Sequence, residues 1–372
     1  MRRVLTLWLA LMACTPALRA QTPADAPAVV DARELIVLTA EAPEELVAAA
    51  ETLGYAVRAV HPLPDLGDTL VSFEIPEGTT IPEAIAEIEA AVPGVTAGAN
   101  HVYQVPVAMA GGGRDYAGAM IGWPAKGCRG QVRVGMIDAG VATEHPGLAD
   151  GRILQRAFTD GAAPESDHGT LVAELLVGPN RLRDATLLSA LVVNPALGRG
   201  DAAGVTPILR AADWLAAEGV QVVNVSLAGP YNKLMDRALG RAAADGMTFV
   251  AAAGNLGPDE PPQYAAAFSF TLAVTAVDRE GAVYRNAGRG PHIDIAAPGV
   301  DILAAPGGRL RVSSGTSLAA PFVTGVVAAD PTLAGLDVST LRVELARRAL
   351  DLDEAGPDDT VGVGLLRARP DC

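Results

Sequence analysis

The sequence predicts an α/β protein: a parallel β-sheet covered by helices on both faces, preceded by a small α+β unit. From about residue 120 onward, short and nearly continuous apolar runs recur, as expected of strands buried on both faces. Stretches with helical periodicity lie between these runs, and such alternation is typical of a parallel sheet. A length of 372 residues, half of them hydrophobic, is enough for one large and one small domain.

The small unit spans residues 34–104. The elements that can be placed in it are, in order, a strand at Glu34–Leu38, a helix at Pro43–Leu53, a strand at Leu70–Ile75, a helix at Ile81–Ala91 and a strand ending near Tyr103. We assign them the order β-α-β-β-α-β, which is the ferredoxin-like arrangement. The glycine-rich stretch Ala110–Gly113 then indicates an exposed linker, which we place at 105–119.

The main domain is expected over residues 120–372. Its predicted strands are apolar and short: Val132–Ile137, Val220–Val225, Thr248–Ala253 and Leu272–Val277. Amphipathic helices are expected at about 206–218, 232–244 and 339–350. Because ligands bind outside the carboxyl ends of the strands in such sheets, the residues that follow each strand are the first candidates for a site.

The N-terminus has the features of a secretory signal peptide. Basic residues at positions 2 and 3 precede Val4–Ala13, ten apolar residues that are too short to span a bilayer. We expect cleavage after Ala20, so that residues 1–20 are removed; lipoprotein processing at Cys14 is the alternative. No later run is long and apolar enough to span a membrane, which favours an exported protein, secreted or periplasmic.

Net charge and cysteine content limit the kinds of partner that the protein can bind. The net charge of −15 argues against nucleic acid or an anionic membrane as a partner, since both require a basic patch. Once the signal peptide has left, Cys128 and Cys372 remain, either as a disulfide or as two thiols. Neither has a companion at metal-ligand spacing. We expect a monomer that needs no cofactor for its chemistry, and we leave structural calcium open.

Four polar residues follow predicted strands or open predicted helices. Asp138 ends a strand, His168 opens an apolar helix, Asn255 follows a strand and Ser317 opens another apolar helix. An Asp can fix an imidazole tautomer, and a His near neutral pKa can act as a general base. An Asn amide and a helix N-terminus can both stabilise an oxyanion. Taken alone, His168 and Asp138 are more often structural residues, and Ser317 and Asn255 also fit a plain N-cap and a turn.

Together these residues resemble the subtilisin-like serine proteases (subtilases), whose triad follows the chain order Asp, His, Ser. The resemblance covers about residues 120–370. It is carried by the stretch Gly-Thr-Ser-Leu-Ala-Ala-Pro around Ser317, by His168-Gly169-Thr170 and by Ala251–Asn255. It implies a subtilisin-like fold and a serine endopeptidase acting on polypeptides.

The resemblance also implies a role for each residue. Ser317 corresponds to the nucleophile, His168 to the general base and acid, and Asp138 to the residue that orients His168. Asn255 corresponds to the oxyanion donor.

The segment Ser226-Leu227-Ala228 corresponds to the strand that pairs with the substrate backbone, with Leu191–Gly200 on the other side. Ala228 stands where the family has Gly, and its methyl is expected to narrow the pocket. Glu174 replaces another common Gly; six residues past His168, about 240° around a helix, it is not expected to touch the triad.

The small unit resembles, more weakly, an inhibitor-type subtilase propeptide, which implies a zymogen whose own propeptide is a partner. A permanent substrate-binding or docking domain is the alternative. We expect autocatalytic cleavage between Gln104 and Gly113, preferably in Val107–Gly111 because Pro106 disfavours the bonds that it forms.

Other functions were weighed. A catalytically silent subtilase fold, used as a binding or chaperone module, is the principal alternative. An α/β-hydrolase esterase would need Gly-x-Ser-x-Gly and a His after the Ser, but no His follows His292. A Rossmann dehydrogenase would need Gly-x-Gly-x-x-Gly after its first strand, and Asp138–Ala142 does not provide it.

Overall fold

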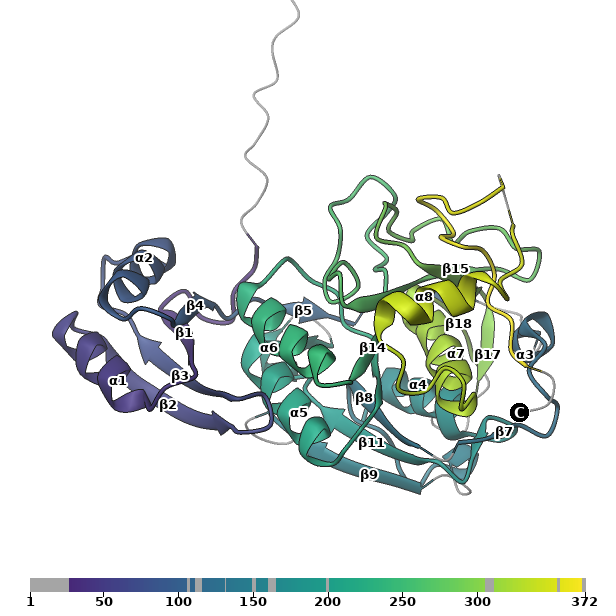
Figure 1. Ribbon diagram of the computed structural model, residues 1–372, viewed down its shortest axis with the longest axis horizontal. Helices are drawn as coiled ribbons and strands as arrows, with labels where there is room; N and C mark the ends of the chain where they lie inside the picture. Colours follow the sequence, from purple (N-terminus) through teal and green to yellow (C-terminus); the bar gives the residue numbers. More distant parts are fainter. Residues whose placement is uncertain are drawn as a thin grey trace, which may run out of the picture.

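The computed structural model describes residues 27–105, 108–110, 116–130, 132–148, 152–159, 165–198, 201–304, 311–352 and 355–369. Its centre is a seven-stranded sheet with the order β16-β15-β14-β13-β8-β11-β9 (Figure 1). Every neighbouring pair is parallel, as predicted. The strands are β8 (Arg133–Asp138), β9 (Arg152–Ala157), β11 (Thr186–Leu191), β13 (Val222–Val225), β14 (Thr248–Ala252), β15 (Thr271–Val277) and β16 (Ile295–Pro298).

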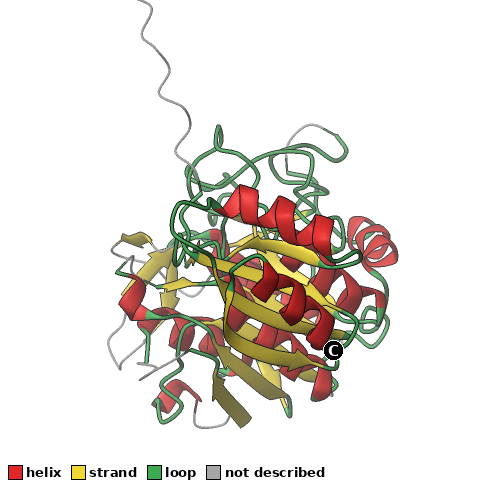
Figure 2. Ribbon diagram, turned by 90° about the vertical axis from the view of Figure 1, so that its left-hand side faces the viewer, coloured by secondary structure: helices red, strands yellow, loops and turns green. Residues whose placement is uncertain are grey.

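Helices cover both faces of this sheet, and Figure 2 shows the sheet between them. On one face α5 (Val205–Ala217) and α6 (Lys233–Ala244) share an apolar core with alternate strand residues. On the other face lie α4 (Asp167–Val177), α7 (Thr316–Ala329) and α8 (Val338–Ala346). Every residue of α7 is buried, so this helix lies within the protein rather than on its surface. The fold class predicted from the sequence is therefore confirmed.

The N-terminal unit has the predicted element order. It consists of β1 (Glu34–Thr39), α1 (Pro43–Thr52), β2 (Ala56–Leu63), β3 (Asp68–Glu74), α2 (Ile81–Ala91) and β4 (Thr96–Ala99). The strands form an antiparallel sheet in the order β2-β3-β1-β4. One face of this sheet packs on α1 and α2, and the other shares the apolar core of α5 and α6. The unit thus covers two helices of the main domain, as Figure 1 shows.

Charged groups also join the two parts of the chain. The side chain of Asp68 is wholly buried between two guanidinium groups, 2.6 Å from Arg237 and 3.2 Å from Arg241. The Asp213 carboxylate on α5 accepts hydrogen bonds from the N–H groups of Asp65 (2.8 Å) and Leu66 (3.1 Å). Burial raises the pKa of Asp213. Since a buried ion pair broken on one side is strongly destabilising, these contacts hold the unit in one orientation.

The predicted linker at 105–119 contains regular structure that the sequence did not predict. β6 (Ala108–Ala110) lies within it, and α3 (Ala117–Ile121) begins within it. The remaining short elements are β5 (Tyr103–Gln104), β7 (Cys128–Arg129), η1 (Pro146–Leu148), β10 (Leu182–Arg183), η2 (Pro195–Leu197), β12 (Ala202–Ala203), β17 (Ile302–Ala304) and β18 (Arg311–Ser314).

Several sequence predictions fall at the ends of the chain. Cys128 is disulfide-bonded, while Cys372 lies outside the described residues. So do residues 1–26, with the predicted signal peptide and Cys14. In the described part of the chain, none of the helices has the length and apolar character needed to cross a bilayer. The same residues contain no group of three or more side chains arranged to bind a metal ion.

Candidate active site

Asp138, His168 and Ser317 come from three different elements and meet in a buried chain of hydrogen bonds. Asp138 ends β8, His168 is the second residue of α4, and Ser317 is the second residue of α7. The Nδ1 atom of His168 lies 2.8 Å from Oδ1 of Asp138, and its Nε2 atom lies 3.0 Å from Oγ of Ser317. All three side chains are almost fully excluded from solvent.

The hydrogen-bond partners determine the direction of these bonds. The Asp138 carboxylate can only accept, so Nδ1 of His168 donates to it and Nε2 is left to accept from the Ser317 hydroxyl. Oδ1 of Asp138 also accepts from the Ala139 N–H at 2.6 Å, whereas Oδ2 has no hydrogen-bond partner. A neutral imidazole with its acceptor nitrogen toward a hydroxyl is the arrangement that general-base catalysis needs.

The sequence around His168 places the imidazole at a helix N-terminus. Ser166 is the N-cap of α4, and its Oγ accepts from the His168 N–H at 3.1 Å. The same Oγ donates to Asp201 at 2.9 Å, so the cap is itself held in place.

Ser317 lies in the first turn of α7, where backbone N–H groups have no partner within the helix. Asn255 lies beside this turn. Its Oδ1 accepts from the N–H of Thr316 at 3.0 Å and from the Thr316 hydroxyl at 2.9 Å. The Thr316 hydroxyl in turn accepts from the Gly254 N–H at 3.1 Å. Thr316 therefore fixes the orientation of the Asn255 amide, a role that was not predicted from the sequence although Thr316 directly precedes Ser317.

The segment Ser226–Ala228 does bind an extended chain, and that chain belongs to the protein itself. The N–H and C=O of Ala228 pair with those of Gln104 at 3.0 and 2.9 Å. On its other side, β5 pairs antiparallel with β12. The strand that pairs with β5 there, Ala202–Ala203, comes directly after the range Leu191–Gly200 that was expected to flank the bound chain.

Tyr103 anchors the bound segment. Its side chain is fully buried, and its hydroxyl donates to the Pro230 carbonyl at 2.7 Å. A Cβ atom at Gly229 would lie 2.5 Å from the ring, so only glycine leaves room for it. Burial raises the pKa of the Tyr103 phenol, which therefore stays a neutral donor.

The chain is paired again at β6, shortly after β5. β6 pairs antiparallel with β18, and Ala108 lies opposite Ser314, three residues before Ser317. The segment that leaves the N-terminal unit is therefore paired at two places, through β5 with Ala228 and β12 and through β6 with β18.

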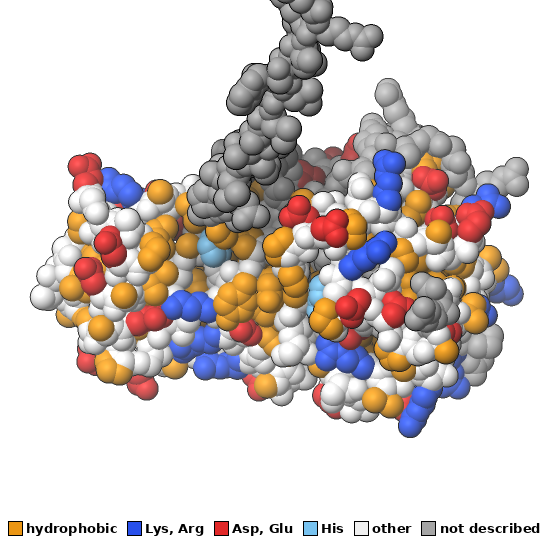
Figure 3. Space-filling view, turned by 90° about the horizontal axis from the view of Figure 1, so that it is seen from above, with side chains coloured by type: hydrophobic (Ala, Val, Ile, Leu, Met, Phe, Trp, Pro, Cys, Tyr) orange, Lys and Arg blue, Asp and Glu red, His pale blue; other side chains and the backbone are white. Residues whose placement is uncertain are grey.

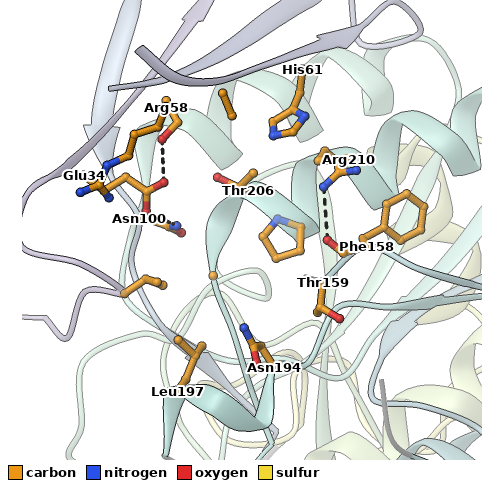
Figure 4. Close-up of a pocket in the computed structure, with 15 residues that line it drawn as sticks. Glu34, Arg58, His61, Asn100, Phe158, Thr159, Asn194, Leu197, Thr206 and Arg210 are labelled. Carbon is orange, nitrogen blue, oxygen red and sulfur yellow. Dashed lines mark hydrogen bonds between the residues drawn. The ribbon is translucent and has the colours of Figure 1, made fainter. Parts of the chain in front are cut away.

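A cavity of about 330 Å³ lies between the N-terminal unit and the start of α5, and Arg58, His61, Asn194 and Arg210 are among the residues that line it (Figure 4). Its lining includes none of the four predicted catalytic residues.

The surface seen from above is mixed in character. Apolar side chains gather near the middle of this face, and acidic and basic side chains are interspersed around them (Figure 3).

Comparisons with known proteins agree with this geometry. The chain is 27% identical over 248 residues to the minor extracellular protease Epr of Bacillus subtilis, covering 63% of this chain and 38% of Epr. It is 30% identical over 210 residues to subtilisin E of the same organism, covering 53% of this chain and 54% of subtilisin E. The chain thus spans about half the length, or less, of these relatives.

A solved structure and a family model extend these similarities. Fervidolysin from Fervidobacterium pennivorans, a keratinolytic enzyme related to subtilisin, has the same fold, with a TM-score of 0.74 at 22% identity over 90% of this chain and 60% of that one. The model of the subtilase family (Peptidase_S8) matches residues 129–364, which is more than half of the chain. The protein therefore belongs to the subtilase family.

Proposed function

We propose that the protein is a serine endopeptidase that cleaves polypeptides through an acyl-enzyme. The observation that carries this proposal is the buried series of hydrogen bonds from Asp138 through His168 to Ser317. Fluorophosphonates react with activated serine nucleophiles, so they provide the direct test. We expect stoichiometric labelling of the active protein at Ser317, identified by peptide mapping; absence of labelling would instead favour a silent binding module.

The proposed reaction follows from the geometry. Ser317 Oγ attacks the substrate carbonyl while its proton passes to Nε2 of His168, and Asp138 stabilises the resulting imidazolium. The Ser317 N–H and the Asn255 amide donate to the oxyanion. Collapse breaks the C–N bond, and the leaving amine takes the proton from His168. Water then attacks the acyl-enzyme by the same route and restores the Ser317 hydroxyl.

We further propose that the N-terminal unit is an inhibitory propeptide and that its C-terminal tail occupies the substrate cleft. Support comes from β5, which pairs with Ala228 and β12 as an extended substrate would. Export of the zymogen accords with the apolar segment at the start of the chain and with an extracellular relative. The retained alternative, a permanent docking domain, differs in one measurable way: residues 34–104 would stay attached in the active enzyme.

The pairing of Gln104 with Ala228 and of Ala108 with Ser314 leads us to narrow the predicted site of self-cleavage to the three bonds that join residues 105 to 108. Two of these three bonds involve Pro106, whose ring fixes φ and removes an N–H. We expect Pro106→Ala to speed self-processing by about tenfold, one decade being about 1.4 kcal/mol of barrier. The time course of the shorter product on gels measures it.

Val105→Ala is the matched control for this prediction, because it shortens a neighbouring side chain without altering the backbone restriction. Its processing rate should remain close to that of the wild type. N-terminal sequencing of the product should give residue 106, 107 or 108. A Pro106→Ala protein that matures no faster, or a cut beyond Ala110, would contradict the proposed register.

Substrate preference is expected to follow the uncharged lining of the cleft. Ser226 and Leu227 bury their side chains, and the Ala228 methyl carbon lies 3.8 Å from where a Cβ on Gly254 would be. Without a carboxylate there, a Lys or Arg before the scissile bond has nothing to pair with. We expect cleavage after apolar residues such as Leu, Met or Ala, measured with a peptide library. Ala228→Gly should raise severalfold the rate of cleavage after the largest aromatic residues. A cleavage profile dominated by Arg or Lys before the scissile bond would refute the predicted preference for apolar residues.

A further inference from the structure

A series of contacts at four-residue intervals joins helix α4 to the loop that follows Asp138. Each contact pairs one residue of the helix or its cap with one residue of the loop. They are the Ser166 N–H to the Gly140 carbonyl (2.9 Å), the Ala142 N–H to the Thr170 hydroxyl (2.9 Å), and Nδ1 of His145 to Oε1 of Glu174 (2.8 Å). We call these three contacts the loop–helix zipper.

The spacing gives the zipper its shape. Residues four apart lie on the same face of a helix, so Ser166, Thr170 and Glu174 form one stripe along α4. The loop approaches this stripe so closely that a Cβ at Gly169 would lie 2.4 Å from the Ala139 carbonyl oxygen. The backbone just after Asp138 therefore packs directly on the helix that carries His168.

The last contact of the zipper is a buried contact between an imidazole and a carboxylate. The side chains of His145 and Glu174 are only 6% and 10% exposed. The turn closes over the pair tightly: a Cβ at Gly147 would lie 2.4 Å from Oε1 of Glu174. A carboxylate this buried is retained only where a partner compensates its desolvation, so the pair fastens the far end of the loop.

We propose that Glu174, through His145, is a positioning residue of the active site. Asp138 and His168 belong to separate elements, so their 2.8 Å contact depends on how the loop after β8 sits on α4. The zipper fixes that relation, and Glu174 is its end farthest from the reacting atoms. The inference rests on the proposed endopeptidase function, and it assigns to Glu174 an indirect effect although its side chain contacts His145 rather than the triad.

The proposal predicts a split between kcat and KM. The substrate-pairing segments Ser226–Ala228 and Ala202–Ala203 are not part of the zipper, so substrate binding should change little. A misplacement of about 1 Å can cost about 10²-fold in rate, and the loss of one of three contacts should cost less. We expect Glu174→Ala to lower kcat and the rate of fluorophosphonate labelling about tenfold, with KM within twofold. Glu174→Gln, which can still accept from His145, should retain most of the activity.

A second variant tests the same contact without removing a charge. Gly147→Ala introduces a methyl against the Glu174 carboxylate, at a position where the backbone conformation permits alanine. It should lower kcat severalfold in the wild type. In a Glu174→Ala background the closest obstructing atom is gone and only the contact with Nδ1 of His145 at 3.1 Å remains, so the same change should have a much smaller further effect.

Arg348→Ala is the control for stability alone. Arg348 pairs with the buried Asp330 just beyond the end of α7, about 20 Å of helix away from Ser317. It should lower the Tm and leave kcat and labelling unchanged. Two results would overturn the positioning role: an unaltered kcat in a folded Glu174→Ala protein, or a loss of kcat/KM that is explained by a higher KM alone. Neither result would affect the proposed function, which labelling of the wild type tests separately. A wild type that neither labels nor cleaves would refute the proposed function, and the positioning role with it.

Discussion

Replacing Ser317 by alanine is expected to lower kcat by about 10⁶-fold, the magnitude known for the nucleophile of subtilisin itself. The change removes the one hydroxyl that Nε2 of His168 can activate, at 3.0 Å. Because a small side chain also fits the first turn of α7, the fold should persist. Hydrolysis of a peptide substrate measures the loss, and fluorophosphonate labelling should vanish with it.

Two neighbouring serines provide matched controls. Ser314 is committed elsewhere, since its Oγ accepts from the Asp301 N–H at 2.9 Å. Ser313 lies in β18 and pairs with Met109 of β6. Alanine at either position should leave labelling intact, and undiminished labelling of Ser317→Ala would contradict the assignment of the nucleophile.

The same variant tests the zymogen proposal. The Ser317→Ala protein should accumulate uncleaved, with Tyr103 still packed against Gly229 and the N-terminal unit still attached. Normal processing of Ser317→Ala in a protease-free host would show that cleavage is not the protein's own work. An active wild type that retains residues 34–104 would favour the permanent docking domain.

Asp138→Asn is expected to lower kcat by about 10⁴-fold with little change in KM, a size known for this position in both chymotrypsin-like enzymes and subtilisin. The side chain keeps its shape but loses the charge that stabilises the imidazolium of His168. In asparagine an NH₂ group would take the place of Oδ2, which has no hydrogen-bond partner among the described residues. This NH₂ group would be buried without an acceptor, which adds to the loss of kcat. Steady-state kinetics on the purified mature enzyme measure both parameters.

Asp68→Asn is the contrasting variant, because Asp68 is equally buried but lies between the N-terminal unit and α6. Once the unit has been removed, its kcat should equal that of the wild type, whereas the unit should dissociate faster. A mature Asp138→Asn enzyme with more than a tenth of wild-type kcat would refute the orienting role.

Local pattern located β8, β13, β14 and β15 of the main sheet, but not β9, β11 or β16. Strands such as β13 and β15 are buried along their whole length, so their composition alone identified them. β9 was missed because it is an edge strand, and its sequence Arg152–Ala157 is mostly exposed and lacks an apolar run. α8 ends at Ala346, before the predicted residue 350, where periodicity could not locate the helix end.

The sequence by itself determined the subtilase family and the four candidate catalytic residues, because each of these residues lies in a short motif of consecutive residues that can be read without knowing the fold. Only the tertiary structure decided what lies beside them: Tyr103–Gln104 in the cleft, Thr316 behind Asn255, and Glu174 against His145. The reason is physical. Periodicity and capping act over a few residues of chain, whereas these contacts depend on the register and packing of elements from 29 to more than 100 residues apart, for which no local pattern selects a partner.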